Sequence, residues 1–295
     1  MKFLKIPVFL LLILIAQSSL AQKDIKSLKE QIINNSDYDK VEGMALDIVK
    51  TGFNAGDGYN QVWARDLNTF IKYSCRILPR ETIRDALLRF FYFQGFDGNM
   101  VGGYEEVPPG FKADNYAVYE SIRENVRNYL WDDKNNKFIP HIYIRCKEFA
   151  GIDESEIYYH GGTIVAIEAG VLDKDEVGES LRIMRANVKA AGAMSVGLTM
   201  YPPCPDGSFE NKGMGAYQYQ NGGDWTWFGA RLIPGLVRYG FVEEAIAELE
   251  PFIKRVIEND GFYEWYTISG EPRGSGTFRG SAGVLLEAIE KLREL

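Results

Sequence analysis

A carboxylate surrounded by aromatic residues is the feature of the sequence that points most directly to chemistry. Glu264 lies within the run Gly261-Phe262-Tyr263-Glu264-Trp265-Tyr266. Burial among rings raises the pKa of a carboxyl group or requires a partner for it. Such a group can serve as a general acid or base. The alternative is an exposed glutamate on a strand-like edge, and we interpret Glu264 as a candidate catalytic residue.

A second stretch, Tyr59–Leu67, places two adjacent charges beside an indole ring. Arg65 and Asp66 follow Trp63 at the start of an expected helix. An acidic residue there also favours the helix dipole, and an adjacent ion pair on the surface is common. The same three residues could instead bind a polar ligand that has an apolar face.

A third stretch joins amides, glycines, an acid and an indole. Gln220 and Asn221 precede two glycines, and Asp224 and Trp225 follow them. Glycines allow the backbone to approach another group closely. Asp224 could simply cap the helix that begins after it, but a cap alone would not need the amides and the tryptophans around it.

The scarcity of histidine narrows the chemistry. The chain has two, His141 and His160, which excludes a histidine-rich metal site and disfavours a serine-histidine-aspartate triad. His160 could line a pocket or be a satisfied residue at a helix start. We therefore expect acid-base work to fall on carboxylates, with no metal and no cofactor. A last glycine-rich stretch, Gly274–Ala282, lacks the glycine spacing of a dinucleotide site and is interpreted as a pocket rim.

Helical periodicity dominates the elements that must position these residues. Long loops rich in glycine and proline, at 95–111, 198–219 and 262–278, alternate with short turns. This pattern is typical of helical hairpins with a site at one end, so we expect a mostly helical, single domain over 22–295. Residues 138–146 are expected to form a strand or extended arm. Helices are expected at 24–34, 41–50, 61–78, 81–94, 114–130, 163–170, 174–190, 225–239, 242–258 and 282–292, with Asp114 capping the fifth.

The first residues of the chain resemble a secretory signal. Lys2 and Lys5 precede an apolar run that is too short to span a bilayer, and Ser19 to Ala21 offer a cleavage site after Ala21. We expect residues 1–21 to be removed and the protein to be secreted or periplasmic, without membrane insertion.

Composition restricts the partners of the mature chain. The formal net charge of the full chain is −8, and removal of Lys2 and Lys5 with residues 1–21 takes it to −10, which argues against nucleic acid and anionic membranes. Aromatic residues make up 13% of the chain, which suits the apolar faces of sugars but would also suit a helical core. The pairing of Cys75, Cys146 and Cys204 stays open, including no pairing at all.

Taken together, these stretches resemble the six-hairpin glycosidases, a group that includes neutral/alkaline invertases, trehalases and glycogen-debranching-type glucosidases. The stretch Val62–Asp66 is similar to an early aromatic-Arg-Asp motif, and Gln220–Trp225 to a Gln-Asn-Gly-Gly motif. The segment Phe262–Tyr266 is similar to the one that carries the catalytic base. The likeness is best near Trp63 and over the C-terminal third.

The resemblance implies an (α/α)6-type toroid that hydrolyses a glycosidic bond with inversion. Glu264 would be the base that activates water, and a second carboxylic acid would protonate the leaving oxygen. The family's acid segment has no clear counterpart, and Asp114 is the best local substitute. Substrate contacts would come from the remaining candidates: Trp63, Arg65, Asp66, Gln220, Asn221, Asp224, Trp225 and Trp265.

The chain departs from the family pattern in its missing acid segment and its number of expected helices, and this leaves two hypotheses. A complete barrel has twelve helices and about ten are expected here from periodicity, so the chain could be shortened by one hairpin. The first hypothesis is an exported inverting hydrolase of a small glucoside or oligosaccharide. The second is a degenerate sugar-binding toroid that lacks the general acid. A lyase or epimerase on the same fold is disfavoured by the two histidines.

Overall fold

The fold is seen in a computed structural model, which describes residues 26–93, 100–107, 110–117, 127, 129–139 and 153–295. The described part is mostly helical, which confirms the predicted class. Within it no helix is long and apolar enough to cross a membrane.

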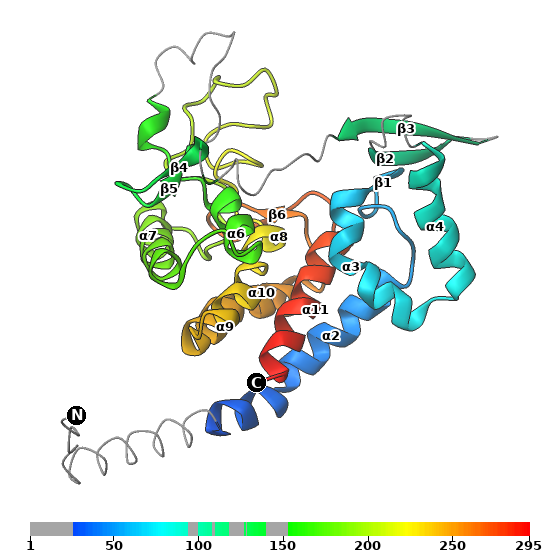
Figure 1. Ribbon diagram of the computed structural model, residues 1–295, viewed down its shortest axis with the longest axis horizontal. Helices are drawn as coiled ribbons and strands as arrows, with labels where there is room; N and C mark the ends of the chain where they lie inside the picture. Colours follow the sequence, from blue (N-terminus) through cyan, green and yellow to red (C-terminus); the bar gives the residue numbers. More distant parts are fainter. Residues whose placement is uncertain (1–25, 94–99, 108–109, 118–126, 128, 140–152) are drawn as a thin grey trace, which may run out of the picture.

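The helices form two layers (Figure 1). In the inner layer α3 (Ala64–Ile77) contacts α11 (Arg279–Arg293), α11 contacts α9 (Leu232–Arg238), and α9 contacts α6 (His160–Glu168). In the outer layer α2 (Ser36–Val49) packs on α11 and α3, and α10 (Val242–Asn259) packs on α9 and α2. The short α8 (Thr226–Gly229) lies beside α6 and α11, and α7 (Lys174–Ala191) packs on α6. This alternation of inner and outer helices is the arrangement of an α/α toroid of hairpins.

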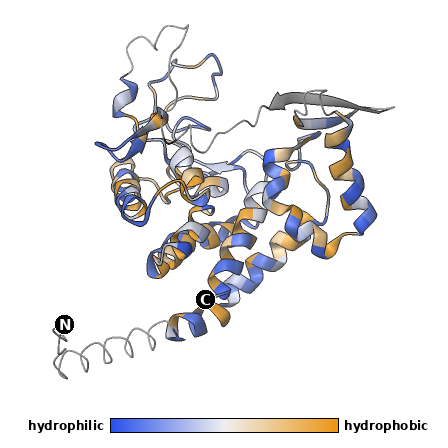
Figure 2. Ribbon diagram, viewed as in Figure 1, coloured by the Kyte–Doolittle hydropathy of each residue, from blue (hydrophilic) through white to orange (hydrophobic). Residues whose placement is uncertain are grey.

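Amphipathic helices account for this layering. Figure 2 shows hydrophobic and hydrophilic residues alternating along the outer helices. In α10, for example, Leu249, Phe252 and Val256 are buried at helical spacing. The inner α11 is buried along most of its length, as expected of a helix with neighbours on several sides.

The ends of α7 follow sequence rules closely. Asp173 and Glu176 form a reciprocal capping box at its start. Gly192 ends it in the left-handed conformation at φ 66°. The predicted boundaries of this helix are therefore nearly those observed.

A β-sheet replaces parts of three predicted features, the first of which is the start of the helix expected over 61–78. Strands β1 (Gln61–Trp63), β2 (Met100–Val107) and β3 (Gly110–Ala117) form an antiparallel sheet in that order, and α4 (Arg80–Tyr92) packs on β2. The expected loop over 95–111 is thus wrong at β2. Gly103 is needed there because a Cβ would lie 2.9 Å from Cε3 of Trp63.

The expected helix over 114–130 is also wrong at its start. Asp114 lies inside β3, opposite Gly103, so it caps no helix. Smaller elements complete the described part: β4 (Trp131–Asp132) with β5 (Lys137–Phe138), β6 (Trp265–Tyr266) with β7 (Pro272–Arg273), and a 3-10 turn, η1 (Glu154–Glu156). Most of the predicted strand over 138–146 lies outside the described residues.

Candidate active site

A pocket of about 860 Å³ opens at one end of the helical layers. Residues from both ends of the chain line it, together with the start of α6 and the segment before α8. The sequence candidates that line it lie in the segments 63–66, 220–225 and at Glu264, and α6 contributes small and apolar residues. Its lining includes Tyr59, Trp63, Arg65, Asp66, Gly162, Tyr219, Gln220, Trp225, Trp227, Arg231, Glu264 and Phe278.

Glu264 is held in the pocket by its backbone and by a tyrosine. Its amide donates to the carbonyl of Ser275 at 2.9 Å. Its side chain is 5% exposed, and Oε2 accepts a hydrogen bond from Tyr59 Oη at 2.8 Å. Gly274, at φ 70°, lies so close that a Cβ would come within 2.4 Å of Oε2. The carboxylate is therefore confined on two sides.

Asp66 is a second buried carboxylate of the pocket. It is the third residue of α3 and is 2% exposed. Neither of its oxygens has a hydrogen-bond partner, and the nearest cation is Nη2 of Arg65, at 3.5 Å. Burial raises the pKa of Asp66 against the opposing charge of Arg65. A buried acceptor without a donor is costly, and a hydroxyl group in the pocket could supply the missing donor.

Aromatic rings and two arginines form the rest of the polar wall. Trp225 and Tyr219 lie at 5.1 Å between ring centroids, and Trp225 Nε1 donates to the Tyr219 carbonyl at 2.9 Å. Arg65 and Arg231 both lie over Trp227, at 5.8 and 4.4 Å from its centroid. Such rings can stack on the apolar faces of sugars while neighbouring polar groups bind hydroxyls.

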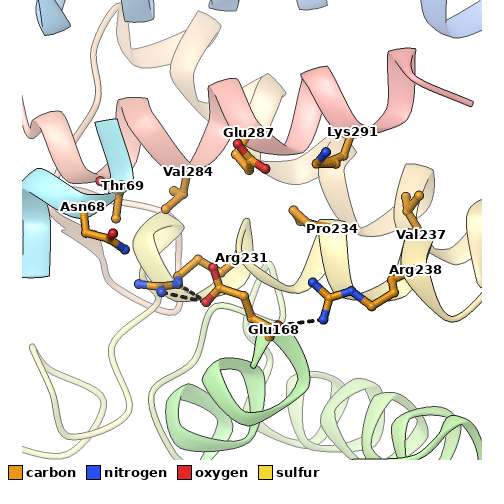
Figure 3. A pocket seen from close by; sticks show the side chains of 10 residues that line it. All are labelled: Asn68, Thr69, Glu168, Arg231, Pro234, Val237, Arg238, Val284, Glu287 and Lys291. Carbon is orange, nitrogen blue, oxygen red and sulfur yellow. Dashed lines mark hydrogen bonds and ion pairs between the residues drawn. The ribbon is translucent and has the colours of Figure 1, made fainter. Parts of the chain in front are cut away.

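Arg231 also lines a second cavity, of about 380 Å³. Figure 3 shows this cavity between α11, α9 and the end of α6, with Arg231 pointing to the carboxylate of Glu168. The two side chains form a paired contact at 2.6 and 2.7 Å. Arg231 and Glu168 thus form part of the boundary between the two cavities.

Three of the predicted substrate contacts do not line this pocket. Asn221 is fully buried and exchanges hydrogen bonds with the backbone of Cys204, at 2.7 and 2.9 Å. Asp224 is fully buried and pairs with Arg255 at 2.8 Å. Trp265 packs behind the wall, 6.1 Å from the ring of Tyr219. These residues build the loop that presents Gln220 and Trp225.

The alternative interpretation of Asp224, as a helix cap, is wrong. Trp225 is the N-cap residue of α8, and no side chain caps that helix. Asp224 is instead committed to its ion pair, so the polar cluster around it has a structural cause that the sequence pattern could not show.

His160 is a buried structural residue at the start of α6. Its Nδ1 lies 3.4 Å from the Val196 carbonyl, and its Nε2 lies 3.2 Å from Nδ2 of Asn187. Burial lowers the pKa of His160 to about 4, so the ring is neutral at physiological pH. Of the cysteines in the described part, Cys75 and Cys204 are free thiols, and Cys146 lies outside it. No cluster of three or more potential metal ligands occurs in the described ranges.

Several lining residues were not singled out from the sequence. Tyr59 begins the first of the stretches, 59–67, and Tyr219 and Trp227 begin and end the stretch 219–227, but none of them was taken as a candidate, and Arg231 lies just beyond. The hydroxyl of Tyr59 and the aromatic ring of Tyr219 give no periodic signal. Their positions in aromatic runs next to acidic residues were the only available indication.

Comparison with known proteins gives limited matches. No protein-family model matches the chain. The mannosylglycerate hydrolase of Rubrobacter radiotolerans is 32% identical over 111 residues, which cover 36% of this chain and 24% of that protein. The chain therefore matches about a quarter of the length of this relative. The likeness agrees with the six-hairpin resemblance, but the relative differs from the invertases, trehalases and debranching-type glucosidases that were expected.

Two solved structures are similar to part of the chain. A GH63 mannosylglycerate hydrolase from Thermus thermophilus, in complex with Tris and D-glycerate, is 21% identical. The match covers 54% of this chain and 35% of that one, with a TM-score of 0.38. An uncharacterized conserved protein from the same organism is 20% identical, covering 54% of this chain and 36% of that one, with a TM-score of 0.40.

Proposed function

We propose that this protein is a glycoside hydrolase that cleaves a small glycoside with inversion, using Glu264 as the general base. The observation that carries the proposal is the geometry of the pocket. Glu264 is hydrogen-bonded through Oε2, and a second carboxylate in the same aromatic cavity, Asp66, has oxygens that, among the described residues, accept no hydrogen bond and are paired only with Arg65, at 3.5 Å. Sequence likeness to a mannosylglycerate hydrolase supports a glycosidase.

The roles follow from the contacts. Glu264 would take a proton from water as the water attacks the anomeric carbon. Because Oε2 already accepts from Tyr59, we assign this proton transfer to Oε1. Asp66, Arg65 and Gln220 would bind sugar hydroxyls, with Trp63 and Trp225 as stacking walls.

The leaving oxygen needs a proton from an acid. Asp114 remains our candidate, now placed on β3 rather than at a helix start. Asp66 is the alternative within the pocket, since burial favours its protonated form. Substrates with different leaving groups distinguish Asp114 from Asp66 as the acid, because a leaving group of low basicity needs little proton donation. A variant that lacks the acid therefore keeps activity on a dinitrophenyl glycoside and loses it on an alkyl glycoside.

The experiment compares the mature protein with Glu264→Gln, Asp66→Asn and Asp114→Asn. Substrates are mannosylglycerate, a panel of small glucosides and oligosaccharides, and matched dinitrophenyl and alkyl glycosides. We expect Glu264→Gln to lower kcat by about 10²–10⁴-fold on all of them while sugar binding by calorimetry persists. Full activity of Glu264→Gln would overturn the assignment of the base.

A second candidate function is a sugar-binding protein without turnover. It is favoured by one observation: beyond the assigned base Glu264, the described residues that line the pocket include a single carboxylic acid, Asp66, and binding sugar hydroxyls would already occupy it. Saturable sugar binding with no product from any substrate would support it over the hydrolase. We also propose export after removal of residues 1–21, to be tested by N-terminal sequencing of the protein recovered from the periplasm or medium.

A further inference from the structure

Behind the pocket, a buried ion pair joins segments that carry its walls. Asp224 is fully buried and Arg255 is 5% exposed. Nη1 of Arg255 lies 2.8 Å from Oδ1 of Asp224, and Ser195 Oγ donates to both carboxylate oxygens, at 2.6 and 2.8 Å. Neither Asp224 nor Arg255 lines the pocket. The pair can therefore affect the site only through the groups that it holds.

The backbone of Asp224 is paired with the segment that contains Glu264. Its amide donates to the Tyr266 carbonyl at 2.9 Å, and its carbonyl accepts from the Tyr266 amide at 2.7 Å. Tyr266 comes two residues after Glu264, and Trp225 follows Asp224 directly. One residue thus links the carboxylate wall to the indole wall.

The guanidinium of Arg255 reinforces this link from α10. It lies 4.2 Å from the ring centroid of Tyr266. Its Nε and Nη2 donate to Thr226 Oγ1, at 3.0 and 2.6 Å. A planar guanidinium with several donors fixes the groups around it more rigidly than an ammonium would.

We propose that the Asp224–Arg255 ion pair positions Glu264, and that Arg255 is a positioning residue of the active site. The inference rests on the proposed function for its kinetic consequence. Glu264 directly precedes β6, which pairs with β7 over two residues. The Ser275 carbonyl holds the amide of Glu264, and the backbone of Tyr266 is held by Asp224, so the Asp224–Arg255 pair restrains the segment two residues beyond the carboxylate.

The test measures local order and turnover in the same variants. Arg255→Gln removes the charge, and Arg255→Lys keeps it but loses the planar contacts. Asp224→Asn combined with Arg255→Gln leaves no unpaired buried charge. This double variant replaces a single variant that fails to fold. The matched control is Arg185→Gln, which removes an ion pair between α7 and Glu248 of the same helix α10, at 2.6 Å.

We expect amide hydrogen exchange over residues 262–267 to become at least about tenfold faster in Arg255→Gln. In the same variant kcat should fall by about 10²-fold, the effect of a misplaced catalytic group, with KM and sugar affinity nearly unchanged. Arg255→Lys should recover part of kcat, and Arg185→Gln should change neither quantity.

Unchanged exchange over 262–267, or equal loss of kcat in the control, would overturn the proposal. A wild-type protein without turnover would contradict the proposed hydrolase. The exchange comparison would still decide whether the ion pair fixes Glu264, so the two failures are distinguishable.

Discussion

The hydroxyl of Tyr59 lies 2.8 Å from Oε2 of Glu264, although 205 positions separate the two residues in the chain. This hydrogen bond connects the loop before α3 with the segment before β6. It orients the carboxylate within the pocket. The consequences of this contact can be measured directly.

Removing the Tyr59 hydroxyl should weaken Glu264 as an oriented base. We expect Tyr59→Phe to lower kcat by about 10- to 100-fold, the equivalent of one hydrogen bond to a charged group. Tyr263→Phe is the control, since Tyr263 is adjacent to Glu264 but does not line the pocket. An unchanged kcat in Tyr59→Phe, or an equal loss of kcat in Tyr263→Phe, would show that the Tyr59 hydroxyl does not orient the base.

A methyl group at Gly274 should displace Glu264. The new Cβ would lie 2.4 Å from Oε2, in addition to the strain of φ 70°. Gly192→Ala has nearly the same strain, at φ 66°, with nothing within 4 Å of the Cβ. We expect both variants to lose about 1 kcal/mol of stability from the left-handed conformation. Only Gly274→Ala should also lose turnover. Stability is measured by urea unfolding and turnover by kcat. Equal kcat values for the two variants would refute the steric explanation.

A large side chain at Gly162 should narrow the pocket without disturbing the fold. A Cβ there meets nothing within 4 Å, and Gly162 lines the pocket from α6. Gly162→Leu should raise KM by about tenfold, the order expected for one obstructing side chain. Stability should rise by about 0.5–1 kcal/mol because glycine is unfavourable within a helix. Gly43→Leu in α2 also has free space and should give the stability gain alone. An unchanged KM in Gly162→Leu would place the sugar elsewhere.

Acid should destabilise the fold through His160. Burial lowers its pKa to about 4 from 6.5, so the unfolded chain takes up this proton first as the pH falls. The stability contribution is complete above pH 6.5 and is lost progressively down to about pH 4. The loss is about 3 kcal/mol by linkage. His160→Gln, which does not titrate, should show a smaller decrease in unfolding free energy between pH 7 and pH 4. Parallel pH dependences for the variant and the wild type would contradict the burial of a neutral histidine.

The helices were predictable where local signals agreed with burial. The turn at Leu172–Asp173 and the periodicity after it gave α7 almost to the residue. The region of β2 was not predictable, because Gly102 and Gly103 indicate a loop. The reason for Gly103, its contact with Trp63, involves residues 40 positions apart.

In the candidate site, too, some residues could be predicted from the sequence and others could not. Glu264, Asp66 and Trp63 were recognised as an acid or an aromatic in a suggestive neighbourhood, and all three line the pocket. Asp224 had an equally suggestive neighbourhood. Its partner Arg255 lies on the opposite side of α8 in the sequence, within an ordinary amphipathic helix. Single-sequence patterns do not reveal which acids are neutralised in the fold.

The last helix has a consequence for how the pocket comes into being. α11 packs against α2 and α3, and Arg279 at its start donates to the backbone and side chain of Asn54 in the loop that leads to Tyr59. These contacts join residues more than 200 positions apart, so they give the fold a high contact order. During synthesis, α3 and the Tyr59 loop cannot form their native contacts with α11 until residues 279–293 have been made. The pocket is therefore among the last features to form, and a nascent chain that lacks α11 would expose the apolar side of α2 and α3 to aggregation.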